Sequence, residues 1–291
     1  MKKILLLTDF SANADNAAAW ALNIAEKLDG SLVLFHSLKL EPISPYYGGG
    51  AFVSETGQLM SEESKEKLSE LCEALRDRAS NKSIVIEELT GEGNLGDFIG
   101  TMTKKEQFEL IVMGARSGGA LEHFLTGSDT RQVIDNAVCP VLIVPATSQN
   151  VALGKAVLAT DFNHGDLRAV DYLNEWAAFF DLQLEIAHVM LPGEKVDAAA
   201  ELAFRKGVNR RENQEMTYHE VSGQELSHRL NRLCSMTQAD ILAMVHYEQG
   251  FFDRLFRHSQ TKHALDKQHF PLLIFPPAFA NAESKCFDKQ S

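Results

Sequence analysis

Short apolar runs alternate along the chain with longer segments in which apolar residues recur at helical spacing. The first half has five apolar runs, which predict strands at 3–9, 31–38, 83–89, 109–113 and 140–144. The amphipathic segments between them predict helices at 11–28, 61–79, 95–105 and 128–136. Strands and helices in this alternation are typical of a parallel sheet connected by crossover helices.

One stretch of the first half, 39–57, does not follow this alternation. It contains Pro42, Pro45, paired tyrosines and three consecutive glycines at 48–50. Proline and glycine in this density predict an irregular excursion.

The second half repeats the order of the first. The motif Thr-Asp-Phe at 8–10 recurs at 160–162, and His36 recurs as His188, both at an offset of 152. A repeat of this size indicates duplication of a whole domain rather than a solenoid. We therefore predict two tandem domains at 1–147 and 153–278, and a polar tail at 279–291.

Charge narrows the range of partners. The 291 residues carry a formal net charge of −12 and show no basic stripe, which argues against nucleic acids and anionic membranes. The apolar run near Met1 is too short for a signal peptide, and no stretch approaches the ~20 apolar residues of a membrane span. We expect a cytoplasmic protein. The cysteines lie far apart, which argues against a disulfide framework and a cysteine-based zinc site; they are Cys72, Cys139, Cys234 and Cys286.

Candidate chemistry gathers where the predicted strands end. Asp9 ends the first strand and Gly114 follows the fourth, so both face one crevice if these strands are neighbours. Gly127 and Ser128 open a helix, where free N–H groups favour an anion such as a phosphate. A nucleotide site needs a polar side chain that binds the ribose or base, a backbone that the ligand can approach closely, and N–H groups that bind the phosphate. The alternative is that Asp9 caps the first helix and the glycines only form turns.

Through these residues the chain resembles the universal stress protein family, and the resemblance extends over nearly its whole length. The ATP-binding branch of that family has Gly-x2-Gly-x9-Gly-Ser/Thr after its fourth strand. Gly114, Gly127 and Ser128 match this pattern, whereas Ser117 stands at the second glycine. Asp9 matches the acid that the family places near the adenosine. The resemblance implies two doubly wound, Rossmann-like (adenine-nucleotide alpha-hydrolase-like) α/β domains, each with five parallel strands, paired within the chain as a pseudo-dimer.

Two departures from the family pattern affect the first domain. Ser117 adds a side chain near the phosphates, although Gly118 follows at once. Asp129 places a carboxylate at the same helix start, where it either competes with a phosphate or helps to hold a metal ion. In the second domain the pattern decays further. At an offset of 131, Gly114, Ser117 and Gly127 become Val245, Glu248 and His258, and only Ser259 survives.

Other motifs carry less weight. Gly91-Glu-Gly-Asn-Leu-Gly96 matches GxGxxG, but the next predicted strand does not end in the acid that a dinucleotide site requires. The second half is rich in histidine without HExxH or CxxC spacing, so zinc is a minority interpretation. His36 and His188 are expected to be structural hydrogen-bonding groups. GxSxG and the P-loop motif are absent from the sequence.

We therefore expect a universal stress protein that acts as a binding and regulatory module and not as a dedicated enzyme. The resemblance implies ATP, with Mg²⁺ beside it, in the first domain only. The implied site residues are Thr8, Asp9, Gly114, Ser117, Gly118, Gly127 and Ser128, with no catalytic residue and no protein metal site. Unknown protein partners and a homodimer are further expectations. Two alternatives stay open, a nucleotide-independent interaction scaffold and a slow metal-assisted nucleotide hydrolase.

Overall fold

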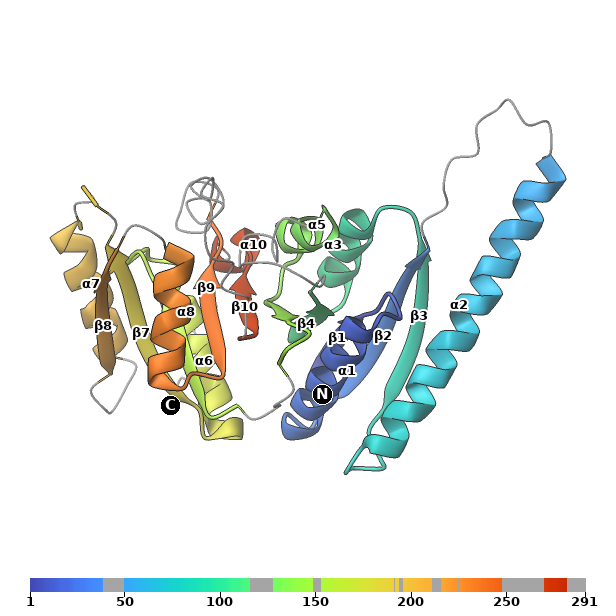
Figure 1. The fold of residues 1–291 in the computed structure, drawn as a ribbon, viewed down its shortest axis with the longest axis horizontal. Helices are drawn as coiled ribbons and strands as arrows, with labels where there is room; N and C mark the ends of the chain where they lie inside the picture. The colour runs from blue at the N-terminus through green and yellow to red at the C-terminus, as the bar shows by residue number, and fades with distance from the viewer. Residues whose placement is uncertain are drawn as a thin grey trace, which may run out of the picture. The chain divides into compact units, whose positions relative to one another are not determined.

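Ten strands and eight helices make up the part of the chain that the structure describes (Figure 1). The computed structural model describes residues 1–38, 50–115, 128–148, 153–190, 192–193, 196–210, 216–223, 226–247 and 270–281. The described residues fall into two compact units, the first up to Ser148 and the second from Leu153. The domain limits at 147 and 153 stay a prediction.

The first unit is a parallel sheet with the strand order β3-β2-β1-β4-β5. Its elements are β1 (Lys3–Leu7), α1 (Ala12–Lys27), β2 (Ser31–Leu38), α2 (Gly50–Arg78), β3 (Ile86–Glu92), α3 (Leu95–Lys105), β4 (Leu110–Gly114), α5 (Ser128–Asn136) and β5 (Val141–Val144). Since α1 contacts α2 and α3 contacts α5, right-handed crossovers place these two pairs on opposite faces of the sheet.

The second unit repeats this topology in the order β8-β7-β6-β9-β10. Its elements are β6 (Lys155–Ala159), α6 (Asp166–Phe180), β7 (Gln183–Met190), α7 (Ala198–Asn209), β8 (Thr217–Ser222), α8 (Leu226–Thr237), β9 (Ile241–Val245), β10 (Leu272–Phe275) and α10 (Pro277–Asn281). Two doubly wound units with five parallel strands each confirm the predicted fold class.

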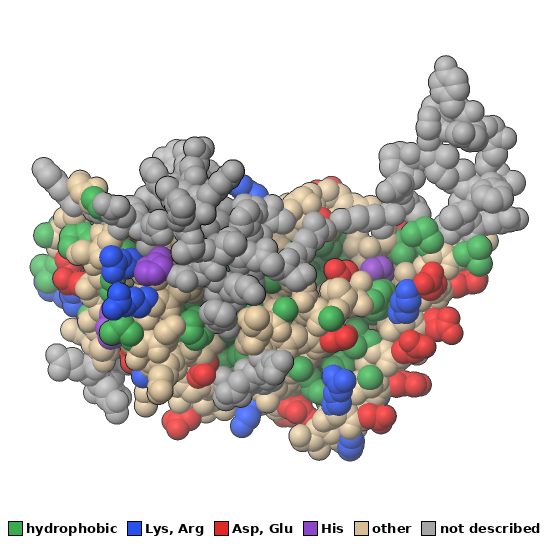
Figure 2. All heavy atoms as spheres, in the orientation of Figure 1, with side chains coloured by type: hydrophobic (Ala, Val, Ile, Leu, Met, Phe, Trp, Pro, Cys, Tyr) green, Lys and Arg blue, Asp and Glu red, His purple; other side chains and the backbone are tan. Residues whose placement is uncertain are grey.

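The central strands are buried on both faces, which explains their continuous apolar runs. Every residue of β5 and β10 is buried, as are the four residues from Ile4 to Leu7 in β1. The helices bury only one stripe. Along α2 this stripe contains Ser64, Leu68, Cys72 and Leu75, and acidic side chains gather on its exposed side (Figure 2).

The structure corrects one sequence prediction. The excursion predicted for 39–57 ends earlier, because α2 begins at Gly50 and runs beyond the end of β3 (Figure 1). The glycine run stops at this residue, and a segment with alanine, glutamate, leucine and methionine follows, in which helix formers outweigh Gly57. The limit at 278 and the polar tail at 279–291 stay predictions; α10 follows β10, and the rings of Phe279 and Phe275 lie 5.2 Å apart at a tilt of 37°.

Candidate functional site

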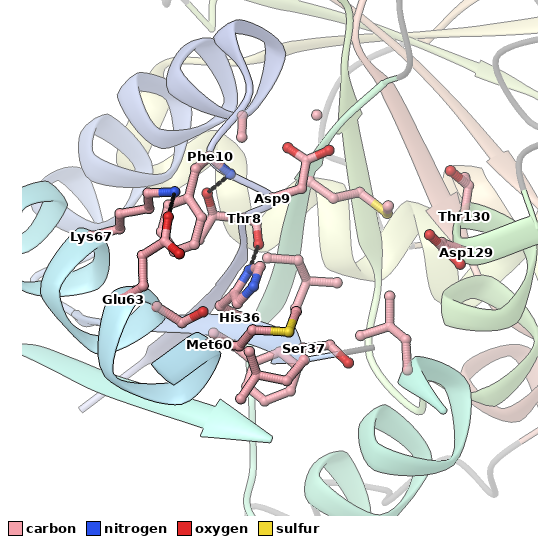
Figure 3. A pocket seen from close by; sticks show the side chains of 18 residues that line it. Thr8, Asp9, Phe10, His36, Ser37, Met60, Glu63, Lys67, Asp129 and Thr130 are labelled. Carbon is pink, nitrogen blue, oxygen red and sulfur yellow. Dashed lines mark hydrogen bonds and ion pairs between the residues drawn. The ribbon is translucent and has the colours of Figure 1, made fainter. Parts of the chain in front are cut away.

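A cavity of about 520 Å³ lies at the carboxyl ends of β1, β2 and β4 in the first unit (Figure 3). In this sheet β1 lies between β2 and β4, so the cavity opens where the strand order reverses. Residues of α2 line one side of the cavity, and Asp129 and Thr130 of α5 line another (Figure 3). Thr8, Asp9 and Gly114 all line it, so three of the predicted site residues meet in one place.

A tight turn after β1 presents the first two of these residues. Thr8 is buried and accepts a hydrogen bond from the backbone N–H of Phe10 (3.0 Å), which has the left-handed φ of 59°. Asp9 is exposed, and its Oδ1 accepts a hydrogen bond from the N–H of Ser11 at 3.1 Å. The side chain that caps α1 is Ser11, which accepts from Ala14 N. Asp9 therefore stabilises the turn before the helix without capping the helix.

His36 supports this turn from β2. Its Nδ1 donates to the backbone carbonyl of Thr8 at 2.8 Å, and its ring lies 4.5 Å from the ring of Phe10. A carbonyl can only accept, so this bond sets the proton on Nδ1. His36 is thus a structural hydrogen-bonding group, as its place at the end of a strand predicts.

Gly114 has a packing role that the sequence motif did not indicate. A β-carbon at this position would lie 2.6 Å from the carbonyl oxygen of Asn13 and 3.0 Å from the N atom of Ala14. The first turn of α1 therefore packs directly on the end of β4. Close approach to a ligand is not needed to explain this glycine, although it also lines the cavity.

The start of α5 contributes a carboxylate. Asp129 lies in the first turn of α5, and the hydroxyl of Ser128 donates to its Oδ1 at 3.4 Å. Ser128 lines a second cavity, of about 620 Å³, which shares Asp129 and Leu95 with the first. Ser117, Gly118 and Gly127 lie outside the described residues, so their predicted roles stay predictions.

The helix α2 also contributes to the cavity, which the sequence motifs did not indicate. Met60, Glu63, Ser64 and Lys67 line the cavity from this helix. Lys67 Nζ donates to Glu63 Oε1 at 2.6 Å and lies 5.9 Å from the ring centroid of Phe10. The hydrogen bond from Lys67 holds the pKa of Glu63 below its ordinary value. The sequence feature that indicates this wall is the spacing of positions 60, 63, 64 and 67, because residues three and four apart lie on one face of a helix.

The GxGxxG segment has a structural explanation at each glycine. A β-carbon at Gly91 would meet the ring of Phe98 at 2.7 Å, and one at Gly96 would meet the side chain of Asn136 on α5 at 2.9 Å. Gly93 has a φ of +105°, a backbone conformation that residues with a β-carbon rarely adopt. These glycines allow β3, α3 and α5 to pack closely and do not indicate a dinucleotide site.

The second unit reproduces the hydrogen bonds of Thr8, Phe10 and His36 in this turn, whereas the N–H of Asn163, which corresponds to Ser11, donates to Asp166. Thr160 accepts from the N–H of Phe162 at 2.8 Å, and Phe162 has a φ of 63°. Nδ1 of His188 donates to the carbonyl of Thr160 at 2.8 Å, and the rings of His188 and Phe162 lie 4.6 Å apart. The motif repeat therefore encodes one turn that occurs in both units.

Beyond this turn the two units differ. In the second unit Val245 ends β9, where Gly114 ends β4. The helix α6 begins at Asp166, six residues after Thr160, whereas α1 begins four residues after Thr8. A β-carbon therefore stands at the place where its absence lets the first turn of α1 approach in the first unit, and α6 begins two residues later than α1 relative to the shared threonine.

A buried hydrogen-bond cluster occupies the matching place. Asp166 is buried, and its carboxylate accepts from the hydroxyls of Thr160 (2.5 Å) and Tyr247 (2.9 Å) and from Asn163 N (3.2 Å). Burial raises the pKa of Asp166 to about 6, against the effect of these hydrogen bonds. Glu248, His258 and Ser259 lie outside the described residues.

Two further observations concern only the described part of the chain. Its His, Cys, Asp and Glu side chains include no group of three or more arranged to hold a metal ion. Among its helices, none combines the length and the apolar character that crossing a membrane requires.

Fold and cavity define the chain as two tandem Rossmann-like α/β units, with a small-molecule cavity at the strand switch point of the first. The family model described as "Universal stress protein family" matches residues 1–145. A universal stress protein of Methanocaldococcus jannaschii is 34% identical over 143 residues, which cover 49% of this chain and 81% of that relative. The chain belongs to the universal stress protein family.

Two other proteins extend this comparison. A universal stress protein of Thermus aquaticus is 32% identical over 143 residues and covers 49% of this chain and 98% of its own length. The crystal structure of a universal stress protein from Archaeoglobus fulgidus aligns at a TM-score of 0.68 with 19% identity, over 94% of this chain and 98% of its own. The likeness to the Archaeoglobus fulgidus structure shows the fold alone, and it extends over both units.

Proposed function

We propose that this protein is a regulatory module of the stress response that binds ATP or a related adenine nucleotide in its first unit. The observation that carries the proposal is the convergence of Thr8, Asp9 and Gly114 with the start of α5 on one cavity. Its volume of about 520 Å³ lies within the range of small-molecule sites. The family motif supplies the expectation of adenine, because these residues match it.

The walls of the cavity suit the two ends of such a ligand. Phe35, Leu38 and Met113 give an apolar surface for a base, and Asp9 offers a carboxylate to ribose hydroxyls or a base amine. The free N–H groups at the start of α5 favour a phosphate. The family pattern assigns Ser117, Gly118 and Gly127 to the phosphates, with Mg²⁺ as a companion ion.

The second unit is proposed not to bind a nucleotide in this manner. Val245 stands in place of Gly114, and the Asp166–Tyr247 hydrogen bond lies where the first unit has its helix start. Opening this region would leave the buried Asp166 carboxylate without partners, which is costly. We propose a scaffold role for this unit, toward a protein partner that the chain does not identify.

We also propose a binding protein rather than a dedicated enzyme. Of the described residues that line the cavity, one is a histidine, His36. Its Nδ1 donates a hydrogen bond to the backbone carbonyl of Thr8. That bond makes the ring part of the wall. A cytoplasmic location and pairing of the units as a pseudo-dimer come from the sequence and belong to the same proposal.

Titration calorimetry of the full-length chain with ATP and Mg²⁺ tests the proposal, and the repeat supplies a matched control. We expect one nucleotide per chain. Asp9→Ala is expected to weaken binding by about tenfold, the effect of losing one hydrogen bond to a charged group, whereas Asp161→Ala leaves it unchanged. Circular dichroism checks that both variants fold.

The outcomes separate the candidate functions. Two nucleotides per chain, or equal losses in both variants, would contradict the assignment to the first unit. No binding at all would favour the nucleotide-independent scaffold. Phosphate release above background that disappears in Asp129→Ala would favour the metal-assisted hydrolase.

A further inference from the structure

We infer that His36 is a positioning residue of the first unit, which holds the turn after β1 in the conformation that presents Asp9 to the cavity. The inference rests on the proposed function, because it concerns how tightly the same site binds an adenine compound. His36 acts through the backbone of Thr8 and not through a bond to the ligand.

The first observation is that this turn needs support. Phe10 is not a glycine, yet it has a φ of 59°, in the left-handed region that residues with a β-carbon rarely adopt. Such a conformation persists only where surrounding contacts hold it. The hydrogen bond from Phe10 N to Thr8 Oγ1, at 3.0 Å, is one of these contacts, and it lies within the turn itself.

The second observation is that His36 holds the turn from another strand. It belongs to β2, which pairs with β1, and its Nδ1 donates to the Thr8 carbonyl at 2.8 Å. Its ring lies 4.5 Å from the ring of Phe10. A side chain whose backbone is fixed in the sheet therefore contacts the residues on both sides of Asp9.

The third observation is where the Asp9 carboxylate points. Figure 3 shows it directed away from the His36 ring, which binds Thr8 from the other side. Oδ1 of Asp9 accepts from the N–H of Ser11 at 3.1 Å. This bond orients the carboxylate and uses one of its two oxygens, so the other can accept from a ligand.

The second unit has the same support under an acid that is largely buried. His188 Nδ1 donates to the carbonyl of Thr160 at 2.8 Å, as His36 does to Thr8. Asp161 Oδ1 lies 3.9 Å from this nitrogen, and the Asp161 side chain is 12% exposed. His188 is therefore the matched control, because it makes the bond of His36 in the unit that is proposed not to bind a nucleotide.

Titration calorimetry of the full-length protein with ATP and Mg²⁺, and separately with adenosine, tests the inference through two replacements of His36. An asparagine amide can donate from near the position of Nδ1, whereas a glutamine amide lies near that of Nε2. We expect His36→Asn to keep the affinity within about twofold and His36→Gln to lower it by about fivefold, the effect of one hydrogen bond. Adenosine should give the same ratios as ATP, because Asp9 is assigned to the ribose or the base.

A double-mutant cycle with Asp9→Ala separates positioning from direct contact. If His36 acts through Asp9, His36→Gln should cause no further loss in the Asp9→Ala protein. His188→Gln should leave the affinity unchanged with or without Asp9→Ala. Circular dichroism checks folding, and His36→Phe, which keeps a ring beside Phe10 and lacks the donor, should repeat the loss if His36→Gln does not fold.

Several outcomes would overturn the inference and leave the proposed function standing. One is that the losses from His36→Gln and Asp9→Ala add, or that His36→Gln keeps the affinity and His36→Asn loses it, since the ligand would then contact His36 itself. Another is an equal loss in His188→Gln, which would indicate general destabilisation. Binding of neither ATP nor adenosine would overturn the proposed function, and the inference with it.

Discussion

Gly114 and Val245 hold matching places at the ends of β4 and β9, and the difference between them is a branched side chain. In the first unit the missing β-carbon lets the backbone of Asn13 approach, so α1 begins early and its start borders the cavity. In the second unit a residue with a β-carbon stands at this place, and α6 begins two residues later relative to the shared threonine. The difference at one residue therefore accompanies a later helix start in the second unit.

Replacement of Gly114 by alanine is expected to lower the free energy of unfolding by about 1–3 kcal/mol, the range for overpacking of a well-packed site. The contact is with backbone atoms of Asn13, which cannot rotate away. Chemical denaturation measures the effect. Gly154→Ala is the control, since a β-carbon there would meet only Asp240, at 3.6 Å. Similar losses in the two variants would show that steric contact at Gly114 is not the cause.

Asp166 makes the stability of the second unit depend on pH. Burial raises its folded-state pKa to about 6 from the ordinary 3.8. A raised folded-state pKa means that the stabilising contribution is complete below 3.8 and is lost as pH rises through 6. Relative to Asp166→Asn, the unmodified protein should lose about 2 kcal/mol between pH 4 and pH 7.

Denaturation at several pH values, compared between the protein and this variant, measures the loss. Asp171→Asn removes one negative charge from the same helix, α6, and should reproduce the pH dependence of the unmodified protein. A constant difference between the protein and Asp166→Asn across this range would show that Asp166 does not titrate there.

At the scale of elements, the sequence predicted most boundaries closely because the local signals are strong. Apolar runs of four to eight residues marked the buried strands, and Ser128 to Asn136 was predicted as the helix observed. The start of α2 was missed because three glycines indicated a loop up to 57. The Asp166–Tyr247 pair was also beyond prediction, since it joins residues 81 positions apart through the fold.

The wall that α2 contributes to the cavity gives a prediction about binding. Met60 lines the cavity and is 41% exposed, so its truncation should weaken adenosine binding by about fivefold, through lost apolar contact, with little effect on folding. Leu59→Ala is the control, because Leu59 is exposed on the same helix and does not line the cavity. Equal effects of Met60→Ala and Leu59→Ala on calorimetric affinity would exclude α2 as a specific wall.

At the scale of the whole molecule, the buried cysteines distinguish the two units. Cys72 and Cys139 lie in the first unit and Cys234 in the second, and burial raises their pKa values to about 11, 12 and 12. Thiolate is the reactive form, so these thiols should resist maleimide until their own unit opens. Because each unit is compact by itself and has its own buried residues, we expect the two to open separately.

Adenosine bound in the first unit stabilises only the state that binds it. In mild denaturant, a concentration 100 times the dissociation constant should therefore slow labelling of Cys72 and Cys139 by about a hundredfold. Labelling of Cys234 should not change.

Peptide mass spectrometry of the Cys286→Ser protein resolves the labelling of the three cysteines. Inosine at the same concentration tests whether binding needs the amine of the adenine base. Equal protection of all three thiols would mean that the units open together, and protection of Cys234 alone would place the ligand in the second unit. Protection limited to the first unit would support the one-site proposal, in which Gly114 lines the cavity of the first unit and Val245 stands at the matching place in the second, because a unit that does not bind the ligand gains no stability from it.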